Sequence, residues 1–313
     1  MDEKGLMSDD EFDEKISELL ANFDKYKAKN QDISKVSKLS EVTQSIEERN
    51  EEEVLRIFER IQDNELTGSA DDYHNAAVGF SHRQQNERAV RVCKVGLKKW
   101  PDNIDLNADA LTYAMDAGLT DELEELAAAL QRNCPDRSRW NWRGFRFLFL
   151  YYIKVKPDGY EEKTKNLIEE YKKYIPADER AYMCEYERYQ GLGKPDEAVQ
   201  ALEEAVTNLK APQCALTLAD IYFERADYDD AIRTATLGIA YAAEPQPGIR
   251  TSYLLMLRAM AKDAIMLKDG NFTAEKTKKI LREYELAKKY VSNREKKIID
   301  FRMDVLKTFG ELV

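Results

Sequence analysis

A twelve-residue pattern that occurs three times restricts the fold of this chain more than any other feature. The segments NERAVRVCKVGL (86–97), PDEAVQALEEAV (195–206) and YDDAIRTATLGI (228–239) align without gaps. Small or medium-sized side chains recur in each segment with spacings of four and three residues: Ala89, Cys93 and Gly96; Ala198, Leu202 and Ala205; Ala231, Ala235 and Gly238. Residues with this spacing lie on one face of an α-helix, and small side chains there let a second helix approach closely. The pattern therefore predicts helices that stack against one another.

An aromatic residue stands nine positions before the leading alanine of each segment, at Phe80, Tyr189 and Tyr222. The copy from Ala70 to Pro101 carries the fullest set of recurring residues: Tyr73, Ala76, Ala77, Phe80, Ala89 and Pro101. Another copy covers about 103–135, although Glu122 occupies a place where a small residue is expected. These features indicate a series of related helical units.

The series resembles the tetratricopeptide repeat (TPR) family, whose signature reads W-x2-L-G-x2-Y…A-x3-F…P over about 34 residues. The chain is similar to a bacterial-type TPR-like helical repeat protein. The resemblance implies an all-α fold, an α-solenoid of TPR-like helix–turn–helix repeats that form a right-handed superhelix. It also implies a concave groove that binds a peptide or protein segment.

Three regions are expected along the chain. Residues 1–66 form an acidic helical segment that caps the stack, residues 67–247 contain the repeats, and residues 248–313 form a last repeat-like pair and a capping helix. The repeats are expected at about 70–101, 103–135, 136–178, 179–212 and 212–245. Residues 1–66 hold 10 basic and 19 acidic side chains, so they account for most of the net charge of −11. This balance argues against a general affinity for nucleic acids.

Apolar side chains at helical spacing predict how the first region packs. One expected stripe is Phe12, Ile16, Leu19, Leu20, Phe23 and Tyr26, and a second apolar set is Ile33, Val36, Leu39, Val42 and Ile46. Asn50 is expected to cap a helix whose first turn is acidic and whose buried face comprises Val54, Leu55, Phe58 and Ile61. The acidic side chains are interpreted as a solvated face, with an electrostatic docking surface as the alternative.

The stretch RSRWNWRGFRFLFLYYIKVK (137–156) holds two of the three tryptophans, six positive charges and no acid. Its apolar run, Phe147–Val155, is interrupted by Lys154 and reaches about half of the ~20 residues that a membrane span needs. We interpret the stretch as the first helix of the unit 136–178, because Trp140, Gly144 and Phe147 match the repeat signature. This unit is about eight residues longer than the others, which predicts roughly two extra helical turns.

Three helices are expected at the carboxyl-terminal end, at about 250–267, 274–291 and 294–309. Thr273 or Asn271 is expected to cap the second of them. The last helix is expected to cover the end of the stack with Ile298, Phe301, Val305 and Phe309, since a repeat cannot bury its own apolar face.

The sequence carries none of the motifs that bind nucleotides, activate a serine or hold zinc. The four cysteines stand alone and are expected to be reduced and mostly buried, and His74 and His82 lie eight residues apart without a ligand pattern. No signal peptide is recognised at the amino terminus. We therefore expect a cytoplasmic protein with no enzymatic activity, no catalytic residue, no cofactor and no metal.

The expected groove residues lie between the signature positions of the first helices. They are Asn75, Asn107, Asn141, Trp142, Arg143, Phe145, Arg180, Glu187, Asp220 and Phe223. Tryptophan and arginine dominate binding hot spots, so the leading hypothesis is a scaffold or adaptor that binds a peptide or protein. The alternative for Trp142 and Phe145 is packing alone.

Three other functions stay open. The first is a TPR-type peptide-signal receptor or regulator. The second is RNA or single-stranded nucleic-acid binding through 137–156, where aromatic and basic residues alternate, although the acidic balance of the chain disfavours it. The third is self-assembly into a homo-oligomer. No membrane partner is expected.

Overall fold

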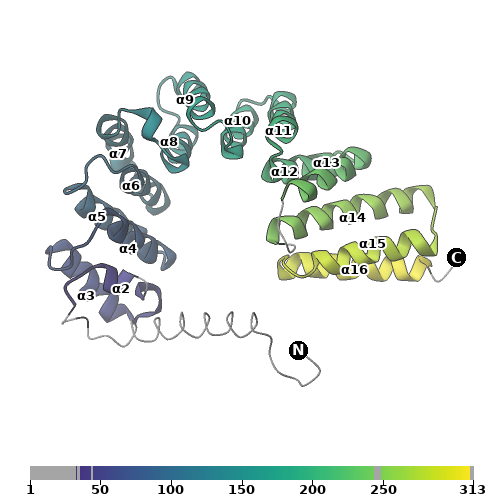
Figure 1. The fold of residues 1–313 in the computed structure, drawn as a ribbon, viewed down its shortest axis with the longest axis horizontal. Helices are drawn as coiled ribbons and strands as arrows, with labels where there is room; N and C mark the ends of the chain where they lie inside the picture. The colour runs from purple at the N-terminus through teal and green to yellow at the C-terminus, as the bar shows by residue number, and fades with distance from the viewer. Residues whose placement is uncertain (1–32, 34–35, 44, 243–247, 311–313) are drawn as a thin grey trace, which may run out of the picture. The chain divides into compact units, whose positions relative to one another are not determined.

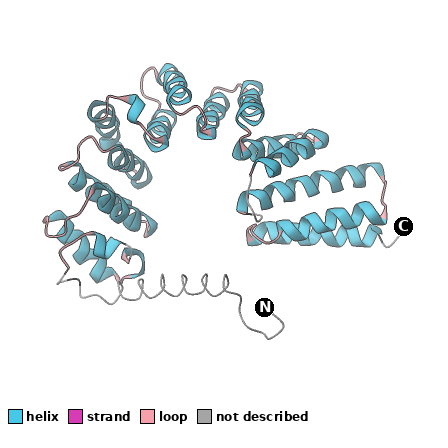
Figure 2. Cartoon of the chain, in the orientation of Figure 1, coloured by secondary structure: helices cyan, strands magenta, loops and turns pink. Residues whose placement is uncertain are grey.

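The computed structural model describes residues 33, 36–43, 45–242 and 248–310, and the expected stripe from Phe12 to Tyr26 lies outside this range. Within it the chain consists of helices and connections, and its only β pairing is an isolated parallel bridge between Lys38 and Thr67 (Figure 2). None of the helices in these ranges is long and apolar enough to cross a membrane. The all-α expectation is confirmed.

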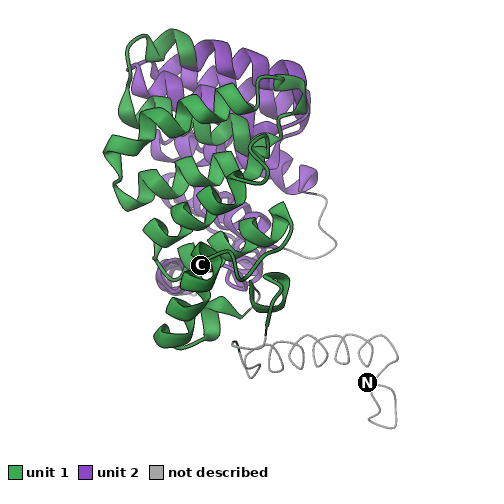
Figure 3. Ribbon diagram, turned by 90° about the vertical axis from the view of Figure 1, so that its left-hand side faces the viewer, with its two compact units in different colours: residues 1–163 green, residues 164–313 purple. Residues whose placement is uncertain are grey.

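The contacts between residues divide the chain into two compact units, Met1–Lys163 and Thr164–Val313, which Figure 3 colours separately. The described helices of unit 1 are α2 (Ser40–Thr43), η2 (Ile46–Glu48), α3 (Glu51–Gln62), α4 (Ala70–His82), α5 (Asn86–Leu97), α6 (Ile104–Ala117), α7 (Thr120–Asn133), η3 (Arg137–Arg139) and α8 (Trp142–Val155). The boundary between the units falls inside α9 (Tyr160–Tyr174).

Unit 2 continues from α9 with seven further described helices: α10 (Glu179–Gly191), α11 (Pro195–Leu209), α12 (Pro212–Glu224), α13 (Tyr228–Tyr241), α14 (Ile249–Asp269), α15 (Ala274–Ala287) and α16 (Asn293–Gly310). Each segment that was expected to be one repeat holds one pair of helices, from α4 and α5 to α12 and α13 (Figure 1). In unit 1 the successive helices from α4 to α8 pack against each other, and in unit 2 those from α10 to α16 do so, as expected for an α-solenoid.

Local signals place the helix ends. Asn50 caps α3 by accepting a hydrogen bond from the backbone N–H of Glu53, and Thr273 caps α15 in the same way. Ser69 and Asp72 form a reciprocal capping box at the start of α4. The predicted caps at Asn50 and Thr273 are therefore confirmed.

The small residues of the repeated pattern lie where two helices approach each other. A Cβ added at Gly96 would stand 2.9 Å from Leu106 Cδ1 and 3.0 Å from Tyr73 Cβ. A Cβ added at Gly238 would stand 2.9 Å from the Cβ of Ala215. Contacts this short leave no room for a methyl group, so glycine at these two positions allows the close packing that the pattern predicted.

The unit 136–178 is long because of its connections. Helix α8 has 14 residues, the same length as α6, so the predicted two extra turns are wrong. The additional residues form the connection from Cys134 to Asn141, which includes the short helix η3. Trp140 lies in this connection, is buried, and donates a hydrogen bond from its indole nitrogen to the Cys134 carbonyl oxygen at 2.8 Å. The tryptophan thus anchors the connection.

Two predicted apolar faces differ from the structure. In α3, Val54 and Ile61 are buried and Phe58 is half-buried, as predicted or nearly so. Leu55, however, is exposed, and Ile57 is buried in its place. In α16 the expected covering residues are instead on the surface: Ile298, Phe301 and Phe309 are exposed and Val305 is half-buried. The buried face of α16 consists of Ile299, Met303 and Leu306, which have the same helical spacing and pack into the core with α14 and α15.

Candidate functional site

A partly buried charged arrangement in unit 1 joins the first helices of three consecutive repeats, α4, α6 and α8. His74 on α4, Asp109 on α6 and Arg143 on α8 stand 35 and 34 residues apart, so they occupy matching positions in their repeats. Helix α6 contacts both α4 and α8. The Nδ1 atom of His74 lies 2.5 Å from Oδ2 of Asp109, and the Arg143 guanidinium forms an ion pair with the other carboxylate oxygen. We call these three residues the charged ladder.

Burial of Asp109 makes its interactions with the other two residues of the charged ladder important for stability. The side chain of Asp109 is 1 % exposed, and those of His74 and Arg143 are 25 % and 21 % exposed. A carboxylate at such depth needs cationic or hydrogen-bonding partners, since its loss of hydration is costly. The hydrogen bond with Asp109 raises the pKa of His74, and desolvation opposes that rise without cancelling it. Protonated His74 therefore stabilises the charged ladder.

The acidic residues of α6 and its preceding turn neutralise much of the charge of the stretch 137–156. Arg143 also lies 3.3 Å from Asp105, and Lys154 lies 3.8 Å from Asp116. Arg139 is 4.0 Å from Asp102. Three of the six positive charges that suggested nucleic-acid binding therefore face carboxylates of the neighbouring repeat.

Aromatic side chains surround Arg143 on the partly exposed surface of α8. The guanidinium lies 5.5 Å from the ring centre of Trp142 and 5.3 Å from that of Phe147. The two rings are 6.0 Å apart in an edge-to-face arrangement. All three side chains are half-buried. We call Trp142, Arg143 and Phe147 the aromatic cluster. Its tryptophan and arginine are residue types that often anchor interfaces, and the ion pair with Asp109 fixes the Arg143 side chain in place.

The structure changes the assignment of two predicted groove residues. Asn107 is 2 % exposed and donates hydrogen bonds to the carbonyl oxygens of Pro101 and Asn103 at 2.8 Å, so it stabilises the start of α6. Phe145 is fully buried and packs against Trp140 with 5.2 Å between ring centres. Neither side chain is available to a partner in a groove, and both predictions are wrong in this respect.

The other predicted residues of unit 1 lie close to the surface. Asn75 is exposed on α4. Asn141 is half-buried and caps α8 by accepting hydrogen bonds from the N–H groups of Arg143 and Gly144. Its amide also donates to Asp105 at 3.0 Å. Asn141 thus fixes the start of α8, next to the aromatic cluster.

The four predicted residues of unit 2 have separate partners within that unit. Arg180 is exposed and pairs with Asp178 at 3.3 Å. Desolvation and then the neighbouring Glu224 raise the pKa of Asp220. Burial is also the main cause that raises the pKa of Tyr186, and the charges of Glu187, Glu224 and Asp220 add to it, so these carboxylates lie near one another. Phe223 is half-buried and packs against Tyr228 with 5.6 Å between ring centres.

Sequence reasoning did not identify Asp105 and Asp109 as members of the site. An aspartate in a helix of an acidic protein is usually exposed to solvent, so the sequence gave no reason to expect Asp105 or Asp109 to be buried. The available signal was the spacing of 35 and 34 residues among His74, Asp109 and Arg143, which matches the repeat length.

The four cysteines are free and buried, as predicted. Burial raises the pKa of Cys134 to about 11 and that of Cys214 to about 12, so both thiols are protonated near neutral pH. In the part of the chain that the structure describes, no group of three or more His, Cys, Asp or Glu side chains could hold a metal ion.

Neither a protein-family model nor a curated protein matches the sequence. Solved structures with this arrangement of helices include Tom70 from yeast, with 15 % identity, a TM-score of 0.52, and coverage of 87 % of this chain and 53 % of that chain. A tetratricopeptide repeat protein from Parabacteroides merdae has 14 % identity, a TM-score of 0.47, and coverage of 86 % and 92 %. PilF from Pseudomonas aeruginosa has 17 % identity, a TM-score of 0.46, and coverage of 69 % and 92 %. The chain has a TPR-like repeat fold.

Proposed function

We propose that this protein is a non-enzymatic interaction scaffold that binds an extended peptide or protein segment along the first helices of unit 1. The aromatic cluster on α8 is the principal contact, and Asn75 on α4 contributes at the other end. The observation that carries this proposal is the half-buried edge-to-face pair of Trp142 and Phe147 beside an arginine that a buried carboxylate fixes in place. Such a surface is rigid before a partner arrives, which lowers the entropic cost of binding.

The bound segment is expected to present an apolar or aromatic side chain to Trp142 and Phe147. Edge-to-face and offset contacts between rings favour such a side chain beyond its buried area. The segment is expected to carry acidic residues as well, since Arg146 on the same helix is only half-buried. Nucleic acid is the weaker candidate because carboxylates of α6 and its turn already face three basic residues of the stretch.

A selection from a random peptide library tests this proposal. The purified wild-type protein is the bait for selection, and the selected peptides are afterwards offered Trp142→Ala as a second bait. We expect peptides that combine an aromatic residue with acidic residues, and hydrogen exchange that slows at the surface of α8 when they bind. Peptides that bind both baits equally, or protection confined to unit 2, would contradict the proposed site.

The structure rules out one obvious variant for this test. Arg143→Glu would place a second carboxylate beside Asp109, which is buried, so loss of binding would reflect disruption of the charged ladder. Trp142→Ala removes the partner-facing ring and leaves the ladder intact. A single-stranded oligonucleotide serves as the competing ligand, and its affinity should fall steeply with salt if the nucleic-acid alternative holds.

A further inference from the structure

A cavity of about 310 Å³ opens in unit 2 between α13, α14 and α15. The cavity is partly open to solvent, so a ligand can reach it from outside the chain. Its size is at the lower end of the range of cavities that hold small organic molecules. The site does not overlap the charged ladder or the aromatic cluster.

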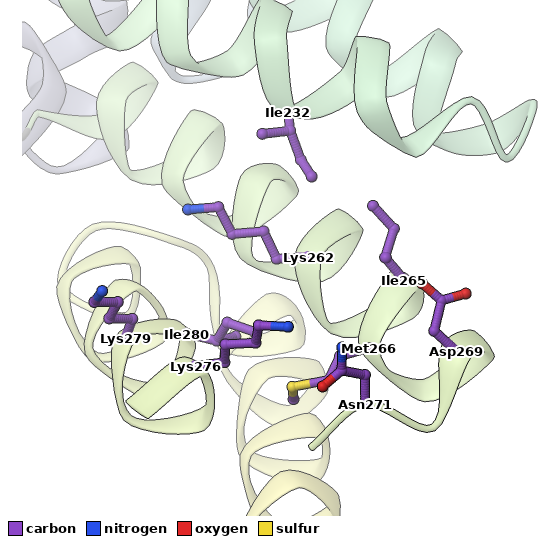
Figure 4. Close-up of a pocket in the computed structure, with 9 residues that line it drawn as sticks. All are labelled: Ile232, Lys262, Ile265, Met266, Asp269, Asn271, Lys276, Lys279 and Ile280. Carbon is purple, nitrogen blue, oxygen red and sulfur yellow. The ribbon is translucent and has the colours of Figure 1, made fainter. Parts of the chain in front are cut away.

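Apolar side chains form most of the wall. Ile232 extends from α13, Ile265 and Met266 come from α14, and Ile280 comes from α15 (Figure 4). Met266 and Ile280 also belong to the core of the last three helices, so this part of the wall is fixed by packing. A hydrocarbon chain would find a complementary surface here.

Lysines are the principal charged groups at the cavity, and they differ in their pairing. Lys262 lies 2.6 Å from Glu283, and Lys279 lies 2.6 Å from Glu275. Among the described residues Lys276 forms no ion pair, although it lies in the first turn of α15 and lines the cavity. Lys276 therefore has an ammonium group that can pair with an anion from outside the chain.

Asp269 is the one carboxylate among the residues that line the cavity. It does not form an ion pair with Lys276, since no nitrogen–oxygen distance of 4.0 Å or less joins them in the described chain. The cavity thus combines an apolar wall with a free cation at its edge. The cation favours a ligand with an anionic head group over one with a cationic head group. The apolar wall favours a ligand with a hydrocarbon chain, because the chain is buried there.

We propose that this cavity binds a small amphipathic carboxylate, with its hydrocarbon chain between Ile232, Ile265 and Met266 and its carboxylate on Lys276. The site is independent of the proposed peptide surface, because all its residues belong to unit 2. A ligand bound between α13 and α15 joins helices of two successive hairpins, so it stabilises their packing by mass action.

The test uses octanoate with the full chain labelled at its methionine methyl groups. Octanoate at millimolar concentration should shift the methyl resonance of Met266, while octanol and octylammonium at the same concentration should bind at least tenfold more weakly. Lys276→Met should weaken octanoate binding about tenfold or more, because a charge-assisted hydrogen bond is lost. Lys278→Met, two residues further along α15 and outside the cavity lining, should change the octanoate affinity less than twofold.

Several results would overturn the proposal. One is an unchanged Met266 resonance at saturating octanoate. Another is equal binding of octanoate and octylammonium, or an affinity that Lys276→Met leaves unchanged in a variant with a wild-type melting curve. A shift caused by an acidic peptide with one leucine, such as acetyl-Leu-Glu-Glu-amide, but not by octanoate, would reassign the cavity to a protein partner.

Discussion

The charged ladder gives the sharpest prediction, because its two cationic partners respond differently to pH. Arg143→Leu leaves the buried Asp109 carboxylate with His74 as its remaining cationic partner. Breaking a buried ion pair on one side costs about 3–5 kcal/mol, and the 21 % exposure of Arg143 favours the lower end of this range, about 3 kcal/mol. The hydrogen bond to Asp109 raises the pKa of His74 above its ordinary value of 6.5.

The sign of the pH effect follows from that shift. Because the folded state holds the His74 proton more tightly than the unfolded state, this stabilisation is fully present below pH 6.5 and is lost as the pH rises through the raised value. Arg143→Leu should therefore lower the free energy of unfolding by about 3 kcal/mol at alkaline pH and by less at mildly acidic pH.

Urea unfolding of the wild type, Arg143→Leu and Asp109→Leu/Arg143→Leu, each at mildly acidic and alkaline pH, measures these differences. The double variant should recover most of the loss, since it leaves no buried charge without a partner and replaces the pair by apolar side chains. The reasoning is refuted if Arg143→Leu costs less than about 0.5 kcal/mol at both pH values, or if the cost is greater in acid.

Three further predictions concern packing and a buried carboxyl group. In thermal melts, Gly96→Ala should destabilise the protein by about 1 kcal/mol, because overpacking outweighs the gain in helix propensity. Gly191→Ala should instead stabilise it by about 0.5 kcal/mol, because no described atom lies within 4 Å of the added Cβ. Ile299→Ala should cost about 3 kcal/mol in urea unfolding because Ile299 is fully buried, and Phe301→Ala should cost less than about 0.5 kcal/mol because Phe301 is 70 % exposed. Desolvation raises the pKa of Asp263 from 3.8 to about 6, so the folded state binds this proton more tightly than the unfolded state. The free energy of unfolding should therefore fall by about 3 kcal/mol as the pH rises through this interval. Asp263→Asn should remove that part of the pH dependence.

The fold could be predicted because the repeated pattern indicates which faces of neighbouring helices pack against each other. Gly96 and Gly238 lie at close helix contacts, as their recurrence indicated. The face of α16 could not be assigned in the same way, since the stripes beginning at Ile298 and at Ile299 are both apolar and differ by one residue. Only the position of α14 and α15 decides which of them is buried.

The candidate site was predictable in part. The composition of the stretch 137–156 drew attention to Trp142 and Arg143, but it could not show that Asp105 and Asp109 of the previous repeat neutralise Arg143. Periodicity alone also placed Phe145 in the groove, although it packs beneath Trp140. A helix with apolar residues on two stripes buries the one that its neighbours cover, and that choice is a property of the tertiary structure.

The affinity of one selected peptide for two matched tryptophan variants tests the central claim most directly. Trp100 is half-buried like Trp142, but it follows α5, and its ring centre lies 5.8 Å from that of Tyr73 on α4. We predict that Trp142→Ala weakens peptide binding at least tenfold, about 1.4 kcal/mol, and that Trp100→Ala leaves it unchanged. Equal affinities for both variants and the wild type would contradict the claim that the aromatic cluster on α8 is the binding surface.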